Sequence, residues 1–263
     1  MPSHNFEQLV LLMRKLRAPG GCPWDAEQTH DSLKRYLIEE CYEVIEAIDS
    51  GNDSHLVEEL GDLLLQPIFH ATIAEERNAF DISDIINSLC EKLIRRHPHV
   101  FSDQQISTSE EQIENWEKIK RHEKGEQRKS ALSGVPPHLP AILKAHKITE
   151  KASRVGFDWE THDQVLDKIR EELAELEETM AAGNTRRIEE ELGDLLFAVV
   201  NLGRFLSIDP EDALRKTIHR FIVRFNFIEE SLLKRGSTPR QSNLQEMELL
   251  WQEAKKSEKE SAV

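Results

Sequence analysis

The sequence predicts an all-α protein made of two tandem, homologous helical units. Charged residues make up 32% of the 263 residues and aromatic residues 6%, with only 11 glycines and 10 prolines, a composition that favours long helices. Apolar residues recur at helical spacing along most of the chain, and no strand-like alternation is long enough to build a sheet. A set of acidic residues and a turn occur twice at one fixed offset, which indicates an internal duplication.

The first half of the chain is expected to contain five helices. The first helix is followed by a turn-rich loop, Pro19–Asp25, in which prolines and glycines prevent the helix from continuing. Pro67 lies inside the third helix and should kink it, because proline lacks a backbone donor. The expected helices are Phe6–Leu16, a helix that starts between Thr29 and Asp31 and ends at Ser50, about Asp53–Arg77, about Ile82–Arg96 and about Glu110–Lys124.

The segment Gly125–Pro140 is rich in glycine, serine, lysine and proline and is predicted to link two domains. The predicted domains are therefore residues 1–124 and 141–263, with the linker at 125–140. One helix of the second half, Thr185–Leu206, is apolar on nearly all sides, so we expect it to pack against the other half or another subunit. The expected helices of this half are about Ala141–Arg154, His162–Met180, Thr185–Leu206, Pro210–Lys234 and Ser242–Lys259.

Two pairs of acidic residues in the second half are predicted to meet. Within each pair the residues are three positions apart, so they project from one face of a helix. The segment Ala181–Asn184 between the pairs is typical of a helix end and a turn, which would bring the two helices together antiparallel. Clustered carboxylates repel one another unless a cation lies among them, and oxygen ligands suit Mg²⁺ or Mn²⁺ better than zinc. The four residues are Glu172, Glu175, Glu191 and Asp194.

Each of these acids has a counterpart 132 positions earlier, as Glu40 has in Glu172. The turn obeys the same offset, since Gly51-Asn52 corresponds to Gly183-Asn184. Composition alone would not keep a turn and two acid pairs in register, so we infer a second potential metal site in the first half. Its acids are Glu40, Glu43, Glu59 and Asp62.

Basic and aromatic residues near the acids suggest a phosphorylated ligand. A metal held by the carboxylates would neutralise a polyphosphate and activate water for attack on phosphorus, with a free carboxylate as general base. Lys168 precedes Glu172 by one turn, where the first half has Tyr36. The alternative interpretations are a solvated acidic face, basic residues that only stabilise helix ends, a simple salt bridge for Lys168, and core positions for the tryptophans. The remaining candidates are Lys92, Arg95, Arg96, Trp116 and Trp251.

The composition also excludes several classes of protein. A net charge of −15 leaves little basic surface for sequence-independent binding of nucleic acid or of anionic membranes. Three cysteines without C-x-x-C spacing are typical of a reducing compartment, and no apolar run approaches the roughly 18 residues of a membrane span. No G-x-x-x-x-G-K-[ST] motif is present, which argues against a P-loop enzyme. We therefore expect a cytoplasmic protein that acts on a small ligand.

Further motifs occur in order around the acids. In the first half Gly21–Asp25 precedes the acids and Arg95–Phe101 follows them, and in the second half Val155–Trp159 precedes them and Trp251 follows. This ordered set resembles the MazG family of nucleoside triphosphate pyrophosphohydrolases over nearly the whole chain. The resemblance implies four-helix-type modules, usually dimeric, that use Mg²⁺ to cleave a nucleoside triphosphate between the α and β phosphates into a nucleoside monophosphate and pyrophosphate.

The resemblance also implies roles for individual residues. Glu172 and Glu175 would be catalytic as well as metal ligands, and Glu191 and Asp194 would complete the metal site. The residues that would bind phosphates or border the nucleotide are Lys168, Arg220, Arg224 and Trp251, and the first-half set is Lys92, Arg95, Arg96 and Trp116.

One segment departs from the family pattern. Relatives tend to show Asn-x-Lys-Phe-x-Arg-Arg-Phe where this chain has Ile218–Phe225, so an asparagine and one arginine are replaced by Ile218 and Val223. We still favour the second half as the active unit, because Lys168 stands beside its acids.

The sequence thus predicts a Mg²⁺-dependent pyrophosphohydrolase that hydrolyses ribo- and deoxyribonucleoside triphosphates with broad base tolerance and forms a homodimer. Two alternatives stay open at this point. One is a non-catalytic helical module that senses nucleotides, and the other is a narrow dUTP or dCTP pyrophosphatase.

Overall fold

The computed structural model describes residues 4–102, 106, 108, 111–113, 115, 116, 119, 123 and 130–261. These residues form helices and no strands, which confirms the predicted all-α class and its tandem modules. They divide into two compact units, Met1–Glu123 and Lys124–Val263. Residues 124–129, where the predicted linker begins, lie outside the described residues. No helix in the described part of the chain is both long and apolar enough to cross a membrane.

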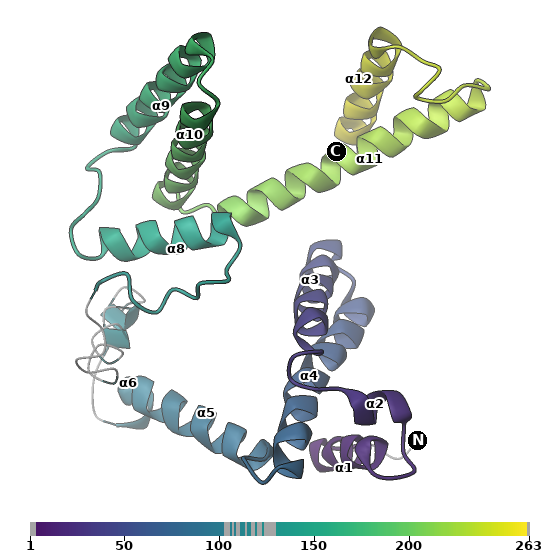
Figure 1. Cartoon of the computed structure of the whole chain (residues 1–263), viewed down its shortest axis with the longest axis vertical. Helices are drawn as coiled ribbons and strands as arrows, with labels where there is room; N and C mark the ends of the chain where they lie inside the picture. Colours follow the sequence, from purple (N-terminus) through teal and green to yellow (C-terminus); the bar gives the residue numbers. More distant parts are fainter. Residues whose placement is uncertain are drawn as a thin grey trace. The chain divides into compact units, whose positions relative to one another are not determined.

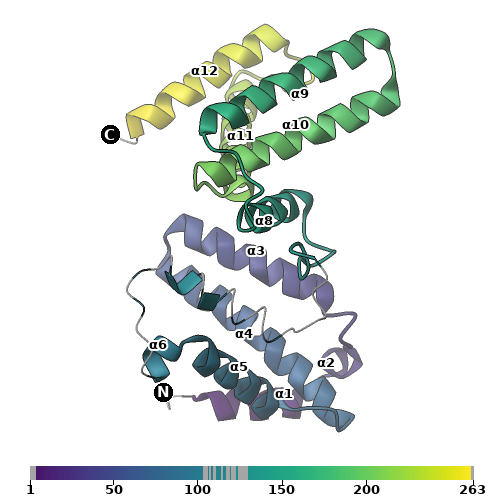
Figure 2. The ribbon, with the colours of Figure 1, turned by 90° about the vertical axis from the view of Figure 1, so that its left-hand side faces the viewer.

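The first unit is centred on a helical hairpin. Helices α3 and α4 run antiparallel and pack along their length, while α1 and α5 pack against α4 (Figures 1 and 2). Pro67 is accommodated within α4, which continues through it. The helices are α1 (Phe6–Arg17), α2 (Pro23–Glu27), α3 (Lys34–Ser50), α4 (Asp53–Glu76), α5 (Ile82–Arg96) and α6 (Pro98–Phe101).

Three details of this unit differ from, or lie beyond, the prediction. The loop Pro19–Asp25 was expected to be irregular, but Pro23 begins the short helix α2, since proline suits a first helical position. Helix α3 begins at Lys34 rather than near Thr29, because the side chains of Thr29 and Ser32 each accept a hydrogen bond from the other's backbone N–H and hold a turn there. The predicted helix Glu110–Lys124 falls largely outside the described residues.

The two copies of the turn have the same backbone chemistry. Gly51 and Gly183 end α3 and α9 in the left-handed conformation, with φ of 64° and 70°. The next residue in each copy, Asn52 or Asn184, caps the following helix by accepting a backbone hydrogen bond with its side chain. Glycine avoids the steric cost of positive φ and asparagine satisfies free helix N–H groups, so each turn folds the chain back on itself.

The second unit contains a second hairpin, made of α9 and α10 (Figure 2). Helix α8 packs against α10, and α11 extends from this junction and carries α12 away from the hairpin (Figure 1). Buried Ile228, Leu232 and Leu250 join α11 to α12. The helices are α8 (Ala141–Ser153), α9 (His162–Ala182), α10 (Thr185–Phe205), α11 (Pro210–Lys234) and α12 (Leu244–Ser261).

Helix α10 is only partly covered within its own unit. Ala198 and Val200 are buried, whereas Leu192, Leu196 and Val199 are exposed. Large exposed apolar residues also lie along α11, among them Phe221 and Ile222. Large apolar side chains exposed along two helices are typical of a surface that another protein covers.

Candidate functional site

The α9–α10 hairpin brings three of the predicted acids together. Glu172 and Glu175 on α9 and Glu191 on α10 each place a carboxylate oxygen within 4.8 Å of the other two. Partial burial and the nearby charge of Glu175 raise the pKa of Glu191, and Asp194 and Glu172 add to this effect against the opposing charge of Arg187. The carboxylates therefore repel one another, as expected of a cluster that would be stabilised by a cation.

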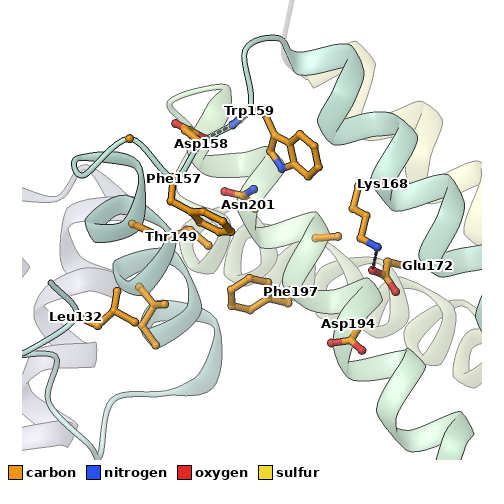
Figure 3. Close-up of a pocket in the computed structure, with 14 residues that line it drawn as sticks. Leu132, Thr149, Phe157, Asp158, Trp159, Lys168, Glu172, Asp194, Phe197 and Asn201 are labelled. Atoms are coloured by element: carbon orange, nitrogen blue, oxygen red, sulfur yellow. Dashed lines mark hydrogen bonds and ion pairs between the residues drawn. The ribbon is translucent and has the colours of Figure 1, made fainter. Parts of the chain in front are cut away.

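Lys168 supplies a positive charge beside this cluster. Its Nζ lies 2.8 Å from Glu172 and 2.7 Å from Glu171, and these two carboxylates raise the pKa of the Lys168 ammonium. The side chain of Glu172 is only 8% exposed, whereas that of Lys168 is 34% exposed. The ammonium group is thus paired with a nearly buried carboxylate (Figure 3), while part of the lysine side chain stays open to solvent.

A cavity of about 480 Å³ opens next to this ion pair. Lys168, Glu172 and Asp194 line its charged end, and its apolar end includes Phe157 and Trp159 from the loop before α9 (Figure 3). The volume is within the range of small-molecule sites, which are roughly 300–1,000 Å³. One cavity therefore offers a charged end for phosphates with a metal ion and an aromatic end for a ring system.

A polar network fixes the loop that carries the aromatic residues. The guanidinium group of Arg204, at the end of α10, donates to both carboxylate oxygens of Asp158, one of them at 2.9 Å. Its Nε donates to Asn201 Oδ1 at 2.8 Å, and the backbone N–H of Trp159 donates to Asp158 at 2.9 Å. Bidentate pairs of this kind hold their partners in one orientation, so the loop is tied to α10.

The first unit repeats the acidic cluster without the lysine. Glu40, Glu43 and Glu59 also place oxygens within 4.8 Å of one another. Burial raises the pKa of Glu40, followed by the charges of Asp62, Glu43 and Glu59. Tyr36 occupies the position equivalent to Lys168, and its ring centroid lies 5.7 Å from that of Trp24. This cluster has the same donor atoms, but it lacks an ammonium group at that position.

The predicted phosphate-binding arginines of the first unit are engaged within that unit. Arg95 and Arg96 each lie 2.6 Å from Glu123, and Arg96 is the main cause of a Glu123 pKa lowered to about 2. The indole of Trp116 donates to the backbone oxygen of Arg96 at 2.8 Å. Lys92 lies one turn before them on α5.

The predicted phosphate-binding residues on α11 and α12 do not line the cavity. Arg224 pairs with Glu258 at 2.7 Å and lies over the ring of Trp251, with 5.3 Å between its Cζ and the ring centroid. Trp251 packs against the Ile228–Leu232–Leu250 cluster, and Arg220 donates to Thr217 at 2.8 Å. Within one chain the structure thus joins Lys168 to the acids and leaves Arg220, Arg224 and Trp251 apart from them.

Sequence reasoning did not assign any role to the residues of the aromatic end. The motif Val155–Trp159 contains Phe157 and Trp159 without indicating a role for either ring, and no motif in the sequence includes Asn201 or Arg204. Arg204 carried a signal that could have been used, because it is the one basic residue within the last turn of an otherwise apolar helix end. Its partner Asp158 is 46 residues away, so no local pattern connects the two.

Comparison with known proteins gives a consistent result. The profile of the MazG nucleotide pyrophosphohydrolase domain matches residues 28–101 and again 160–226. The chain is 52% identical to the nucleoside triphosphate pyrophosphohydrolase/pyrophosphatase MazG of Thermotoga maritima over 95% of both chains. It is 42% identical to the nucleoside triphosphate pyrophosphohydrolase of Escherichia coli K12 over 97% of this chain and 98% of that protein. It is also 46% identical to Bacillus subtilis YabN, of which it covers 53%.

Proposed function

The chain belongs to the MazG nucleotide pyrophosphohydrolase family, and we propose that it hydrolyses nucleoside triphosphates at the α–β phosphate bridge with Mg²⁺ bound by the acids of the second unit. The observation that carries the proposal is the joint location of Lys168, Glu172 and Asp194 at one end of a cavity with aromatic residues at the other. A nucleotide has the same division between its phosphates and its base.

The donor set fits a hard divalent cation. Glu172, Glu175 and Glu191 supply only carboxylate oxygens, which Mg²⁺ and Mn²⁺ prefer, and Asp194 is near enough to raise the pKa of Glu191. When bound there, Mg²⁺ would neutralise phosphate charge and lower the pKa of a water molecule. The positive charge of the bound ion would also offset the repulsion among the ionised carboxylates of the cluster.

The side chains of the chain would do the remaining chemistry. Lys168 would donate to phosphate oxygens, and its partial exposure leaves room for this contact. A carboxylate of Glu172 or Glu175 would accept the proton of the attacking water. The water oxygen forms a bond to phosphorus, the bridging P–O bond breaks, and pyrophosphate leaves with the electron pair of that bond.

We assign activity to the second unit rather than the first because of Lys168. The first unit has Tyr36 at that position, and its Arg95 and Arg96 are paired with Glu123. We also propose that ribo- and deoxyribonucleotides of every base are hydrolysed, since Lys168 and the acids would act on phosphate and metal charge, which all these nucleotides share.

We further propose that the protein is a homodimer. Phe221 and Ile222 on α11 are at least half exposed and Leu196 on α10 is 57% exposed, an arrangement expected of a surface buried between subunits. Light scattering on the purified protein should give twice the mass of one chain. A monomer at micromolar concentration would contradict this part of the proposal.

Product analysis tests the proposed reaction. With ATP or dGTP and Mg²⁺, ³¹P spectra should show a nucleoside monophosphate and pyrophosphate as the first products, and EDTA should abolish turnover. Orthophosphate as the primary product, or full activity in EDTA, would contradict the proposal.

A further inference from the structure

We propose that the aromatic end of the cavity binds the nucleobase and favours bases with a carbonyl oxygen over their amino counterparts. The preference would be for 6-oxopurines over adenine and for uracil over cytosine. This inference rests on the proposed function and assigns base recognition to the end of the cavity that Phe157, Trp159 and Asn201 line.

The aromatic end of the cavity offers a surface for stacking. Phe157 is 82% exposed and Trp159 43% exposed, although both line a cavity and their loop is fixed by Asp158. Aromatic rings with a free face, carried on a loop that is tied to α10, are suited to stacking on a base, whatever that base is. The charged end of the same cavity would then hold the triphosphate of the same nucleotide.

Asn201 supplies a hydrogen-bonding group at this end of the cavity. Asn201 lies between Phe157 and Trp159 in the view of Figure 3. Its Oδ1 accepts a hydrogen bond from Arg204 Nε at 2.8 Å. A guanidinium group has only donors, so this contact determines which amide atom faces Arg204. The NH₂ group of Asn201 is therefore the part that remains for a ligand.

The orientation of the Asn201 amide is held by its neighbours. Arg204 cannot turn away freely, because its other nitrogens donate to both oxygens of Asp158 and its side chain is only 13% exposed. If the Asn201 amide rotated by 180°, its NH₂ group would face a guanidinium donor, and both groups would lose a hydrogen bond. Asp158 and Arg204 are thus positioning residues for Asn201.

The chemical consequence is discrimination at one edge of the base. An amide NH₂ donates to the O6 of guanine or hypoxanthine and to the O4 of uracil. Adenine and cytosine present an NH₂ group at the equivalent atom, so two donors would face each other without an acceptor. The loss of this hydrogen bond should lower affinity by about tenfold.

The test compares nucleotides that differ at that atom. We expect the kcat/KM for pyrophosphate release to be about tenfold higher for ITP than for ATP, and for UTP than for CTP. Asn201→Asp replaces the donors by acceptors and should reduce both ratios to one or below. Asn201→Leu removes the hydrogen bond and should bring both ratios near one. Asn226→Asp, at an exposed position of α11, is the matched control and should leave the ratios unchanged.

The outcomes separate the two proposals. Equal rates for ITP and ATP in the wild type, or ratios that Asn201→Asp and Asn201→Leu both leave unchanged, would overturn the base assignment while pyrophosphate release continued. Release of pyrophosphate from none of the four nucleotides would overturn the proposed function itself, and the base assignment with it.

Discussion

The Lys168–Glu172 pair is the structural feature that most distinguishes the second unit, and replacing Lys168 by methionine tests its energetic role. The substitution leaves the Glu172 carboxylate, whose side chain is 8% exposed, without its nearest positive charge. Two unit charges 2.8 Å apart attract by roughly 1.5 kcal/mol in water and about 6 kcal/mol at an effective dielectric constant near 20. Because the Lys168 side chain is 34% exposed, solvent screens the pair and the low end of this range applies. We expect a loss of about 1–2 kcal/mol.

Thermal unfolding in EDTA measures this loss. A change of about 1–2 kcal/mol should lower the midpoint of the second unit by roughly 3–8 °C. Lys216→Met is the matched control, because it removes a lysine from a 2.8 Å pair with Asp212 whose side chains are 54% and 37% exposed. A double variant that also carries Glu172→Gln should recover part of the stability, since the nearly buried position 172 then carries no unpaired charge. If Lys168→Met lowered the midpoint no more than Lys216→Met, the reasoning would be refuted.

Two further predictions concern His70 in the first unit and the glycine turn of the α9–α10 hairpin. Burial, and then the neighbouring His30, lower the pKa of His70, so the unfolded chain binds a proton at higher pH than the native chain does. The unfolding free energy of the first unit should therefore fall as the pH drops below about 6.5. In urea titrations His70→Gln should flatten this dependence, whereas His219→Gln, at an exposed position, should not. Gly183→Ala should lower the unfolding free energy by about 1 kcal/mol in the same titrations, because φ is 70° at this position, and Gly183→Asn should lower it less. Equal stability of the wild type and Gly183→Ala would contradict this expectation and show that the turn relaxes.

Much of the fold follows from local chemistry that is visible in the sequence. The bounds of α11, Pro210–Lys234, agree with the prediction because Asp209 and Pro210 are a cap and a first helical residue that need no tertiary contact. The meeting of Glu172, Glu175 and Glu191 likewise follows from helical spacing and a glycine turn. These features depend on residues at most a few turns apart.

The features that sequence reasoning missed depend on distant residues. The loop that forms one wall of the cavity is tied to α10 by Asp158 and Arg204, which are 46 positions apart and belong to no periodic pattern. The place of Trp251 depends on how α12 packs on α11, which the helical spacing of either element alone does not determine. The assignment of Trp251 and Arg224 to the nucleotide stays a prediction from the family resemblance.

The central claim is that the acids beside Lys168, and not their copies in the first unit, carry the hydrolysis. The most direct test is pyrophosphate release from ATP and dGTP with Mg²⁺ by two matched variants, Glu172→Gln and Glu40→Gln. Each removes one charge from equivalent positions of the repeat without changing side-chain size. We expect Glu172→Gln to lose about 100-fold or more in kcat and Glu40→Gln to stay within about twofold of wild type. Full activity of Glu172→Gln together with loss of activity in Glu40→Gln would contradict the claim.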